Sequence, residues 1–308
     1  AVFSAVDAES IYDIPILFRD QKIDEFMLKQ FKLKSKRLNL SPWNNYRLKA
    51  GKCKKTVKIA MIGKYVDLAD SYKSLNEALY HAGIINNRLV EITYLDSEQI
   101  TKANVKKLKV MDGILVPGGF GNRGIEGKIL AAQYARINKI PYFGICLGMQ
   151  ISVIEFARNV LKLKNANSTE FNSKTKHPVV ALVDEWKDNL GKKIISDKKN
   201  MGGTMRLGSQ DCTLSKGSLA YRMYEKLAIN ERHRHRYEVN DSLLDLFNDS
   251  GLKFSGKSKK GNLMEIIELK GHPWYLGCQF HPEFTSSPIS GHPLFNGFIA
   301  ASKKKRKL

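Results

Sequence analysis

The stretch IPYFGICLGMQISVIEFARNV, residues 140–160, decides the fold. It opens with an apolar run typical of a buried strand, and MQISVIEFARNV has the apolar spacing of a helix. Between them GICLG (144–148) has the pattern Gly-x-Cys-x-Gly, a nucleophile elbow with cysteine in place of serine. The glycines are needed because side chains on either side of the nucleophile would collide in so tight a turn. The pattern predicts that Cys146 stands at the carboxyl edge of a sheet, where open α/β folds place their sites.

The predicted turn also defines a chemical environment for Cys146. The amino end of the following helix stabilises a thiolate, and the amide of Leu147 is placed to bind a developing oxyanion. One Gly-x-Cys-x-Gly match does not establish a nucleophile, because cysteine is more often a small buried core residue. The assignment therefore depends on other parts of the sequence.

From Val57 onward, short apolar runs alternate with amphipathic stretches. The predicted strands are 57–65, 90–96, 113–121 and 140–148, and the predicted helices are 71–83, 97–109 and 124–139. Strands separated by helices predict an α/β fold with a parallel sheet and right-handed crossovers. After about Asn165, segments such as PVVALVDEW (178–186) and EIIELKGHPWYLGCQF (265–280) predict additional strands. The sequence leaves the topology of that half open.

Residues 1–50 follow a different pattern. The segment IYDIPILFRDQKIDEFMLKQFKL (11–33) has helical apolar spacing. The segment SPWNNYRLKAGKCKK (41–55) is polar, contains proline and predicts a linker. The expected parts are an N-terminal segment (1–55), a main domain (56–302) and a basic tail (303–308).

The composition is that of a chain with a substantial core, since 43% of its 308 residues are hydrophobic. No apolar run approaches the roughly 20 residues of a membrane-spanning helix, and the first residues lack the pattern of a secretory signal. A cytoplasmic protein is therefore expected. The cysteines form no CxxC pair and predict free thiols rather than a zinc or redox site. They are Cys53, Cys146, Cys212 and Cys278.

The formal net charge of +21 raises the question of nucleic-acid binding. The lysines are scattered through every segment, however, and no aromatic-basic RNA-binding signature occurs. The only dense run is the tail SKKKRKL (302–308), which we interpret as a solvated, frayed end rather than a localisation signal or a polyanion-binding segment. Neither a nucleic-acid partner nor a membrane is expected.

The motif PGGFG (117–121) follows a predicted strand. Gly118 and Gly119 leave backbone N–H groups open to a ligand, and Gly119 is a candidate for the second donor to an oxyanion. An ordinary glycine turn is the alternative interpretation. A phosphate loop is disfavoured because neither GxxxxGK[ST] nor a complete GxGxxG occurs here.

The third motif, QFHPEF (279–284), follows the apolar run WYLGC. His281 and Glu283 are two residues apart, so on an extended segment their side chains point the same way. The carboxylate then fixes the tautomer of the imidazole while the ring faces a thiol. An isolated HPE is more often a surface turn. Three motifs that all follow predicted strands together predict a triad of Cys146, His281 and Glu283.

GGFG, GICLGMQ and HPEF together resemble the class I (triad) glutamine amidotransferases. This family implies a flavodoxin-like, open and mostly parallel sheet flanked by helices. The resemblance narrows to the glutaminase half of CTP synthase and runs from about Val57 to about Ala301. Residues 1–50, including SIYDIP (10–15), resemble the end of the synthetase domain and its linker. The segments that carry this closer resemblance are NSTEF (167–171), GGTMRLG (202–208), ERHRHRYEVN (231–240) and GHPWYLGCQFHPEFTS (271–286).

The resemblance implies a role for each candidate site residue. Cys146 attacks the side-chain amide of glutamine, His281 protonates departing ammonia and later activates water, and Glu283 holds the imidazole. A carboxylate suits the α-ammonium group of glutamine, and a guanidinium suits its α-carboxylate. The loop from Phe120 to Arg123 matches a GTP-responsive lid, and no metal site is implied in this chain. The implied oxyanion hole is Gly119 and Leu147, and the implied glutamine-binding residues are Gly119, Phe120, Gln150, Glu170 and Arg236.

The resemblance also implies a division of labour. In the whole enzyme a synthetase domain binds ATP, UTP and magnesium, receives the ammonia and makes CTP, with GTP as allosteric effector. Lys54, Lys55 and Thr56 lack the glycine spacing of a phosphate loop. The chain alone is therefore expected to hydrolyse glutamine without making CTP, with residues 1–50 partly disordered and homo-oligomers only in the full-length enzyme. The alternatives are a stand-alone glutamine or γ-glutamyl amide hydrolase, and a non-catalytic remnant that acts as an assembly module.

Overall fold

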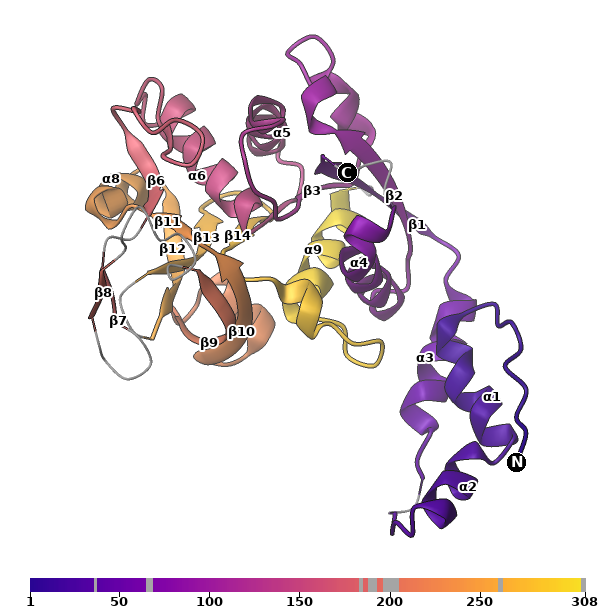
Figure 1. Cartoon of the computed structure of the whole chain (residues 1–308). Coiled ribbons are helices and arrows are strands. Elements are labelled where there is room, and N and C mark those ends of the chain that lie inside the picture. Colours follow the sequence, from indigo (N-terminus) through magenta and orange to yellow (C-terminus); the bar gives the residue numbers. More distant parts are fainter. Residues whose placement is uncertain are drawn as a thin grey trace.

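The computed structural model describes residues 1–35, 38–64, 69–182, 185–187, 193–195, 205–259 and 263–305. Figure 1 shows an α/β domain from which N-terminal helices extend. The strands of the main sheet are β1 (Thr56–Gly63), β2 (Leu89–Asp96), β3 (Gly113–Val116), β4 (Tyr142–Ile145), β9 (Arg206–Leu214), β10 (Ala228–His235), β12 (Leu252–Ser258), β13 (Met264–Leu269) and β14 (Tyr275–Cys278). The smaller sheets contain β5 (Asn167–Ser168), β6 (Pro178–Leu182) and β11 (Tyr237–Val239), and β7 (Glu185–Lys187) and β8 (Lys193–Ile195).

The helices are amphipathic or short. Those of the described residues are α1 (Ile14–Asp20), α2 (Ile23–Gln30), α3 (Ser41–Lys52), α4 (Lys73–Ile85), α5 (Ile125–Ile137), α6 (Leu147–Asn159), α7 (Leu219–Tyr224), α8 (Leu244–Asp249) and α9 (Pro293–Lys305). The 3₁₀ helices are η1 (Ile11–Asp13), η2 (Ala69–Tyr72), η3 (Ser97–Gln99), η4 (Val105–Val110), η6 (Asp241–Leu243) and η7 (Pro282–Thr285). Over the described ranges, no helix combines the length and apolarity that crossing a membrane requires.

The main sheet has the strand order β10-β9-β12-β13-β14-β4-β3-β1-β2. From β2 to β14 its strands are parallel, in the order β2-β1-β3-β4-β14 of a flavodoxin-like fold. From β14 to β10 they are antiparallel. The predicted open α/β sheet is therefore confirmed, and the strands expected in the C-terminal half extend it as a mixed sheet.

Helices cover both faces of the parallel strands (Figure 1). Along β1, Ala60 and Ile62 face a core shared with α5 and α6. Ile59 and Met61 face a second core shared with α4 and α9. Because successive residues of a strand point to opposite faces, a strand covered on both sides needs a nearly unbroken apolar run. This explains why the strand segments were visible in the sequence as continuous apolar runs.

The N-terminal helices extend from the α/β domain beside α4 (Figure 1). The helical prediction for 11–33 is confirmed, although Lys22, with a φ of 59°, separates α1 from α2. The prediction of a linker at 41–55 is wrong, because residues Ser41–Lys52 form α3. Proline is compatible with the first turn of a helix. The helix, which is described throughout, buries Tyr46 alone, and so narrow a buried face produces little apolar periodicity.

The single helix predicted at 97–109 is also wrong, since the structure has the short η3 and η4 there. Between them the side chain of Asn104 accepts from the amide of Thr101 at 2.9 Å and donates to the carbonyl of Gln99 at 2.7 Å. Such side-chain bonds to the backbone compete with the hydrogen bonds of an α-helix. The other strands and helices predicted between 57 and 160 are confirmed over the described residues, with small shifts at their ends.

The basic tail is partly helical rather than frayed. Helix α9 continues to Lys305, and the last three residues of the predicted tail, 306–308, lie outside the described residues. Lysines in the last turn of a helix interact favourably with its dipole. The ammonium group of Lys305 also donates to the carbonyl of Met111 at 2.5 Å, which ties the helix end to the segment between η4 and β3. The division of the chain at residues 55 and 302 stays a prediction.

Candidate active site

The ends of three neighbouring parallel strands carry the predicted motifs. Strand β4 lies between β3 and β14 and is parallel to both. The PGGFG loop follows β3, Cys146 follows β4, and the segment with His281 follows β14. Because neighbouring parallel strands end at the same edge of a sheet, the three motifs meet although they are distant in the sequence.

Cys146 occupies the elbow that the glycines predict. Its φ of 52° and ψ of −103° lie outside the regions that non-glycine residues favour. Its N–H donates to the carbonyl of Cys278 at 2.7 Å, and α6 begins directly after it. A Cβ atom on Gly148 would lie 2.1 Å from the carbonyl oxygen of Val116. A Cβ on Gly144 would lie 2.5 Å from the carbonyl oxygen of Gly148, so both positions require glycine.

His281 connects Cys146 to Glu283. Its Nδ1 atom lies 2.7 Å from Oε1 of Glu283, and the ring lies close enough to Cys146 for the thiol to raise the pKa of the imidazole. A Cβ on Gly118 would lie 2.7 Å from Cε1 of His281 and 3.5 Å from Cβ of Cys146, so this glycine leaves room for the pair. The main-chain N–H of His281 donates to the carbonyl of Arg232 on β10 at 2.7 Å, which anchors the segment. The structure thus brings together the three side chains predicted as a triad.

The extended segment predicted for His281 and Glu283 is wrong. His281 has φ −110° and ψ 85°, and Pro282 then begins η7, which contains Glu283. The fixed φ of proline favours the first position of a helical turn. The carboxylate reaches the imidazole because the chain turns back after His281, and strand alternation has no part in it. We call η7 the Glu283 turn.

Opposing effects determine the pKa of His281. Burial lowers it, but Cys146 and Glu283 outweigh burial and raise the pKa to about 11 from 6.5. The ring is therefore cationic at neutral pH. Since the pKa is raised on folding, protons here favour the folded chain. This contribution to stability is complete below about pH 6.5 and is lost as the pH rises through about 11.

Replacing Glu283 by glutamine is expected to lower the pKa of His281 by roughly one unit or more, because an adjacent carboxylate stabilises the charged ring. An NMR titration of the labelled imidazole measures this pKa. Glu126→Gln is the control, since Glu126 is 72% exposed and pairs with Arg158 on the surface. An unchanged pKa in Glu283→Gln would show that the carboxylate does not stabilise the imidazolium.

The two predicted oxyanion donors lie next to each other. A Cβ on Gly119 would lie 3.3 Å from Cδ2 of Leu147, so the loop after β3 and the start of α6 are in contact. Phe120 follows in the same loop and is 47% exposed.

Gln150 and Glu170 are both tied to the loops around Cys146. The buried amide of Gln150 donates to Oε1 of Gln279 at 3.2 Å and to a carbonyl of β11 at 3.0 Å. Oε1 of Glu170 accepts from the N–H of Gly121 at 2.6 Å, which joins this carboxylate to the loop after β3. Burial raises the pKa of Glu170, although the bond from Gly121 opposes the rise.

Arg236 carries a buried nitrogen, Nη1, that has no hydrogen-bond partner among the described residues. Glu170 and Arg236 both act on the pKa of Tyr237, so their charges lie near the same phenol. Leaving a buried guanidinium nitrogen unpaired costs free energy unless a ligand satisfies it. The unpaired Nη1 atom of Arg236 is therefore a candidate donor to an anionic group of a ligand.

Two further candidate site residues were not predicted from the sequence. The side-chain amide of Gln279 donates to the sulfur of Cys146 at 3.7 Å. Its position at the start of QFHPEF was the sequence feature that could have identified it. Lys64, directly after β1, donates to the carbonyls of Phe120 and, at 3.3 Å, Gly121. It therefore holds the loop after β3, but nothing in the sequence marked a lysine at the end of an apolar run.

The loop predicted as a lid, residues 120–123, lies between β3 and α5. Arg123 donates to the carbonyl of Lys64 at 3.0 Å and lies 3.5 Å from a carboxylate oxygen of Glu98. The response of this loop to GTP stays a prediction. In the part of the chain that the structure describes, no group of three or more His, Cys, Asp or Glu side chains is arranged to hold a metal ion.

Comparisons with known proteins agree with this geometry. The family model for class I glutamine amidotransferases matches residues 67–301. The curated CTP synthase of Buchnera aphidicola subsp. Schizaphis graminum is 52% identical over 312 residues, covering 100% of this chain and 56% of that protein. The chain thus spans little more than half the length of this curated relative.

Among solved structures, the glutaminase domain of Trypanosoma brucei CTPS with bound acivicin is similar, with a TM-score of 0.72 and 39% identity. The match covers 81% of this chain and 94% of that one. The order of the motifs, the sheet topology and both relatives point to the same group of proteins. The chain therefore belongs to the class I glutamine amidotransferases and, within them, to the glutaminase domains of the CTP synthases.

Proposed function

We propose that this site hydrolyses glutamine to glutamate and ammonia, as the ammonia-supplying half of a CTP synthase. The observation that carries the proposal is the position of the His281 imidazole, which lies beside the side chains of both Cys146 and Glu283. A sulfur nucleophile, a ring that transfers protons and an orienting carboxylate are the groups that amide hydrolysis through a thioester requires.

In the proposed reaction the sulfur of Cys146 attacks the carbon of the side-chain amide, and the carbonyl electron pair moves to oxygen. The amides of Gly119 and Leu147 donate to this oxyanion. The intermediate collapses with cleavage of the C–N bond, and the nitrogen takes a proton from His281 and leaves as ammonia. Water then attacks the thioester while His281 accepts its proton, the sulfur leaves as a thiolate, and glutamate is released with the thiolate–imidazolium pair restored.

We place the α-carboxylate of glutamine against Arg236 and its α-ammonium group against Glu170. A planar guanidinium binds a carboxylate through two parallel hydrogen bonds, and this arrangement would satisfy the buried Nη1 atom. Burial raises the pKa of Glu170, and an ammonium partner would favour its charged form. Gln150 and Phe120 then border the ligand from α6 and from the loop after β3.

Replacing Glu170 by glutamine is expected to raise KM for glutamine roughly tenfold with little change in kcat. The new amide still accepts from Gly121 but cannot neutralise the α-ammonium group, and that loss is the same in the ground and transition states. Steady-state release of glutamate measures both constants, with Glu126→Gln as the surface control. A tenfold fall in kcat at unchanged KM would contradict a role in substrate binding.

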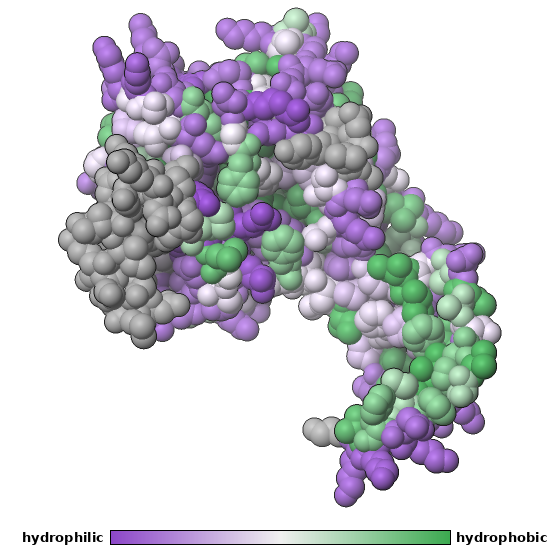
Figure 2. Space-filling model, in the orientation of Figure 1, coloured by the Kyte–Doolittle hydropathy of each residue, from purple (hydrophilic) through white to green (hydrophobic). Residues whose placement is uncertain are grey.

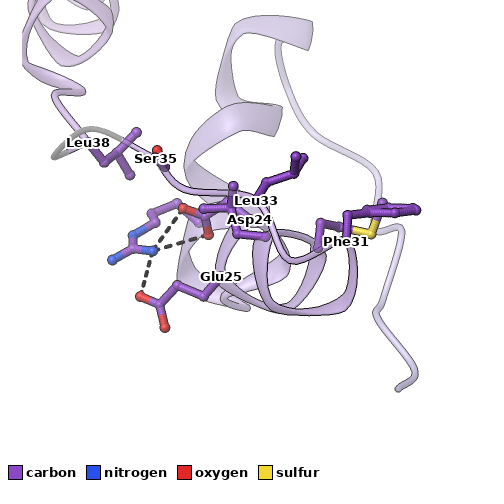
Figure 3. A pocket seen from close by; sticks show the side chains of 9 residues that line it. Asp24, Glu25, Phe31, Leu33, Ser35 and Leu38 are labelled. Atoms are coloured by element: carbon purple, nitrogen blue, oxygen red, sulfur yellow. Dashed lines mark hydrogen bonds and ion pairs between the residues drawn. The ribbon is translucent and has the colours of Figure 1, made fainter.

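The N-terminal helices carry an exposed apolar face, and Figure 2 shows apolar residues gathered on this part of the molecule. A pocket of about 530 Å³ opens there between α2 and the following segment (Figure 3). At its edge Arg19 pairs with Asp24 at 2.9 Å and Glu25 at 2.7 Å. The exposed apolar side chains of this region include Phe18, Met27, Phe31, Leu33 and Leu38.

We infer that this apolar face contacts a synthetase domain, which uses ATP, UTP and magnesium to convert the released ammonia into CTP. Contiguous exposed apolar surface marks protein contact sites, and the Buchnera relative has 44% of its length outside the match, since 100 − 56 = 44. We also propose that GTP acts at the loop 120–123, where Lys64 and Arg123 supply positive charge. Homo-oligomers of the full-length enzyme and a cytoplasmic location belong to the same proposal.

Incubation of the chain with glutamine tests the proposed function. Equal amounts of glutamate and ammonia are expected, with faster release when a synthetase domain and its nucleotides are added. Vigorous turnover that ignores these additions would favour a stand-alone amide hydrolase. No turnover, together with no labelling of Cys146 by a cysteine-directed glutamine analogue, would favour a non-catalytic module. CTP made by the chain alone from UTP, ATP and ammonia would contradict the division of labour.

A further inference from the structure

A series of hydrogen bonds joins the N-terminal helices to the Glu283 turn. The phenol oxygen of Tyr12, in η1, lies 2.5 Å from Nε2 of His81 on α4. The other ring nitrogen, Nδ1, lies 3.0 Å from Oγ of Ser286, which directly follows the Glu283 turn. We call these side chains the Tyr12–His81–Ser286 bridge. Helix α4 is in contact with both α3 and the Glu283 turn, and Figure 1 shows it beside the N-terminal helices.

Glu77 determines which groups of the bridge donate. Its Oε2 atom lies 2.5 Å from the phenol oxygen of Tyr12, and a carboxylate only accepts, so the phenol proton points to Glu77. The phenol oxygen therefore accepts from Nε2–H of His81, and Nδ1 accepts from the hydroxyl of Ser286. Burial lowers the pKa of His81, although Glu77 opposes the fall, and this agrees with a neutral ring.

Aromatic rings of the N-terminal segment hold His81 in place. The histidine is 4% exposed, and the ring centroids of Tyr12 and Tyr46 lie 5.6 and 6.2 Å from its own. Tyr46 belongs to α3, and Trp43 of the same helix donates from its indole N–H to the carbonyl of Tyr12 at 2.5 Å. Movement of η1 or α3 relative to α4 therefore moves the acceptor that His81 uses.

The Glu283 turn is short and is held from two sides. Oγ1 of Thr285 donates to Oε2 of Glu231 on β10 at 3.0 Å. Ser286 donates to His81 on α4 from the other side. The turn has four residues, so a shift at its end reaches the carboxylate of Glu283 directly. Small misplacements of a group that orients a reacting side chain reduce rates strongly.

We propose that His81 is a positioning residue for glutamine hydrolysis. Its hydrogen bond with Ser286 fixes the position of the Glu283 turn. Its hydrogen bond with Tyr12 makes that position depend on the N-terminal helices. The inference rests on the proposed function, because the position of Glu283 matters only if the triad acts. It gives the N-terminal segment a role beyond contact with another domain, since its arrangement on α4 adjusts the reactivity of the site.

Tyr12→Phe and Ser286→Ala each remove one hydroxyl of the bridge and keep the rest of the side chain. Each is expected to lower kcat for glutamine hydrolysis by the full chain roughly three- to tenfold, the effect of one buried hydrogen bond, with KM unchanged. Because both act through His81, the double variant is expected to lose little more than either single variant. Ser286→Thr keeps the hydroxyl and is expected to restore most of the lost kcat.

Tyr80→Phe is the matched control, because Tyr80 lies beside His81 in the sequence, is 39% exposed and has no place in the bridge. Lower unfolding temperatures at unchanged kcat would mean that the bridge is merely structural and would overturn the inference. Fully additive losses of kcat would overturn it as well. If Cys146→Ser keeps its activity, the proposed function itself fails. If that variant is inactive while the bridge variants retain full kcat, the inference alone fails.

Discussion

Replacing Cys146 by serine is expected to reduce glutamine hydrolysis about a thousandfold or more, to a level near the background of the assay. The hydroxyl would occupy the same elbow and face the same imidazole, but it is a far weaker nucleophile than a thiol beside a cationic ring. Release of glutamate by the purified variant measures the effect, with circular dichroism as the check that the chain is folded.

Cys53→Ser provides the matched control for this substitution. Cys53 is also buried, lies before β1 and donates from its sulfur to the carbonyl of Lys49 at 3.3 Å, a bond that serine retains. Its replacement is expected to leave glutamate release unchanged. If Cys146→Ser kept a tenth of the activity or more, the sulfur would not be the nucleophile. Equal losses in both variants would point to damage to the fold.

Replacing Gly148 by alanine is expected to destabilise the folded chain by about 3 kcal/mol or more. The added Cβ would lie 2.1 Å from the carbonyl oxygen of Val116, a main-chain atom of β3 that cannot move aside without disturbing the sheet. Relief of the clash would displace the elbow from β3, so glutamate release is expected to fall together with stability. Thermal unfolding followed by circular dichroism measures the loss, expected as roughly 6 °C or more.

Gly51→Ala is the control for the alanine substitution, because a Cβ at this position of α3 would have nothing within 4 Å. Alanine is favoured over glycine in a helix, so this variant is expected to gain about 0.5–1 kcal/mol. An unfolding temperature for Gly148→Ala equal to that of the unaltered chain would mean that the tight contact between the elbow and β3 does not exist.

The fold class and the position of Cys146 could be predicted from the sequence because both depend on local patterns. A strand buried on both faces must be apolar at nearly every position, as in β1 and β4. The elbow requires glycine at 144, where a Cβ would meet the backbone of Gly148, and at 148, where a Cβ would meet the backbone of β3. Once strands and helices alternate, parallel connection follows, and the carboxyl ends of β3, β4 and β14 become the expected place for a site.

Features that depend on distant partners could not be predicted. Arg206 is 4% exposed and pairs with Glu238 at 2.9 Å and Glu265 at 2.7 Å, whereas the sequence favours a solvated charge at each position. Strand β10 alternates buried and exposed residues, but its buried side chains include charged and titratable groups, so no apolar alternation marks it. The topology of the antiparallel half of the sheet therefore could not be predicted from the sequence.

The relation between His281 and Glu283 shows how a correct pairing was predicted for the wrong reason. Strand alternation would place the two side chains on one face, whereas the structure brings Glu283 to the imidazole through a turn that begins after His281; the sequence does not distinguish the two. The difference matters because a turn depends on its neighbours for its position. Ser286 and His81, which support the Glu283 turn, are distant in the sequence and carry no pattern that connects them.

Covalent labelling tests the central claim, that Cys146 attacks the side-chain amide of glutamine, most directly. A diazoketone analogue of glutamine alkylates a nucleophilic thiol with loss of nitrogen, and mass spectrometry of the digested chain identifies the modified cysteine. We predict modification of Cys146, prevented by excess glutamine, and no modification of the other three thiols, Cys53, Cys212 and Cys278. An unmodified Cys146 in a chain that still releases glutamate, or a label on another cysteine, would contradict the account.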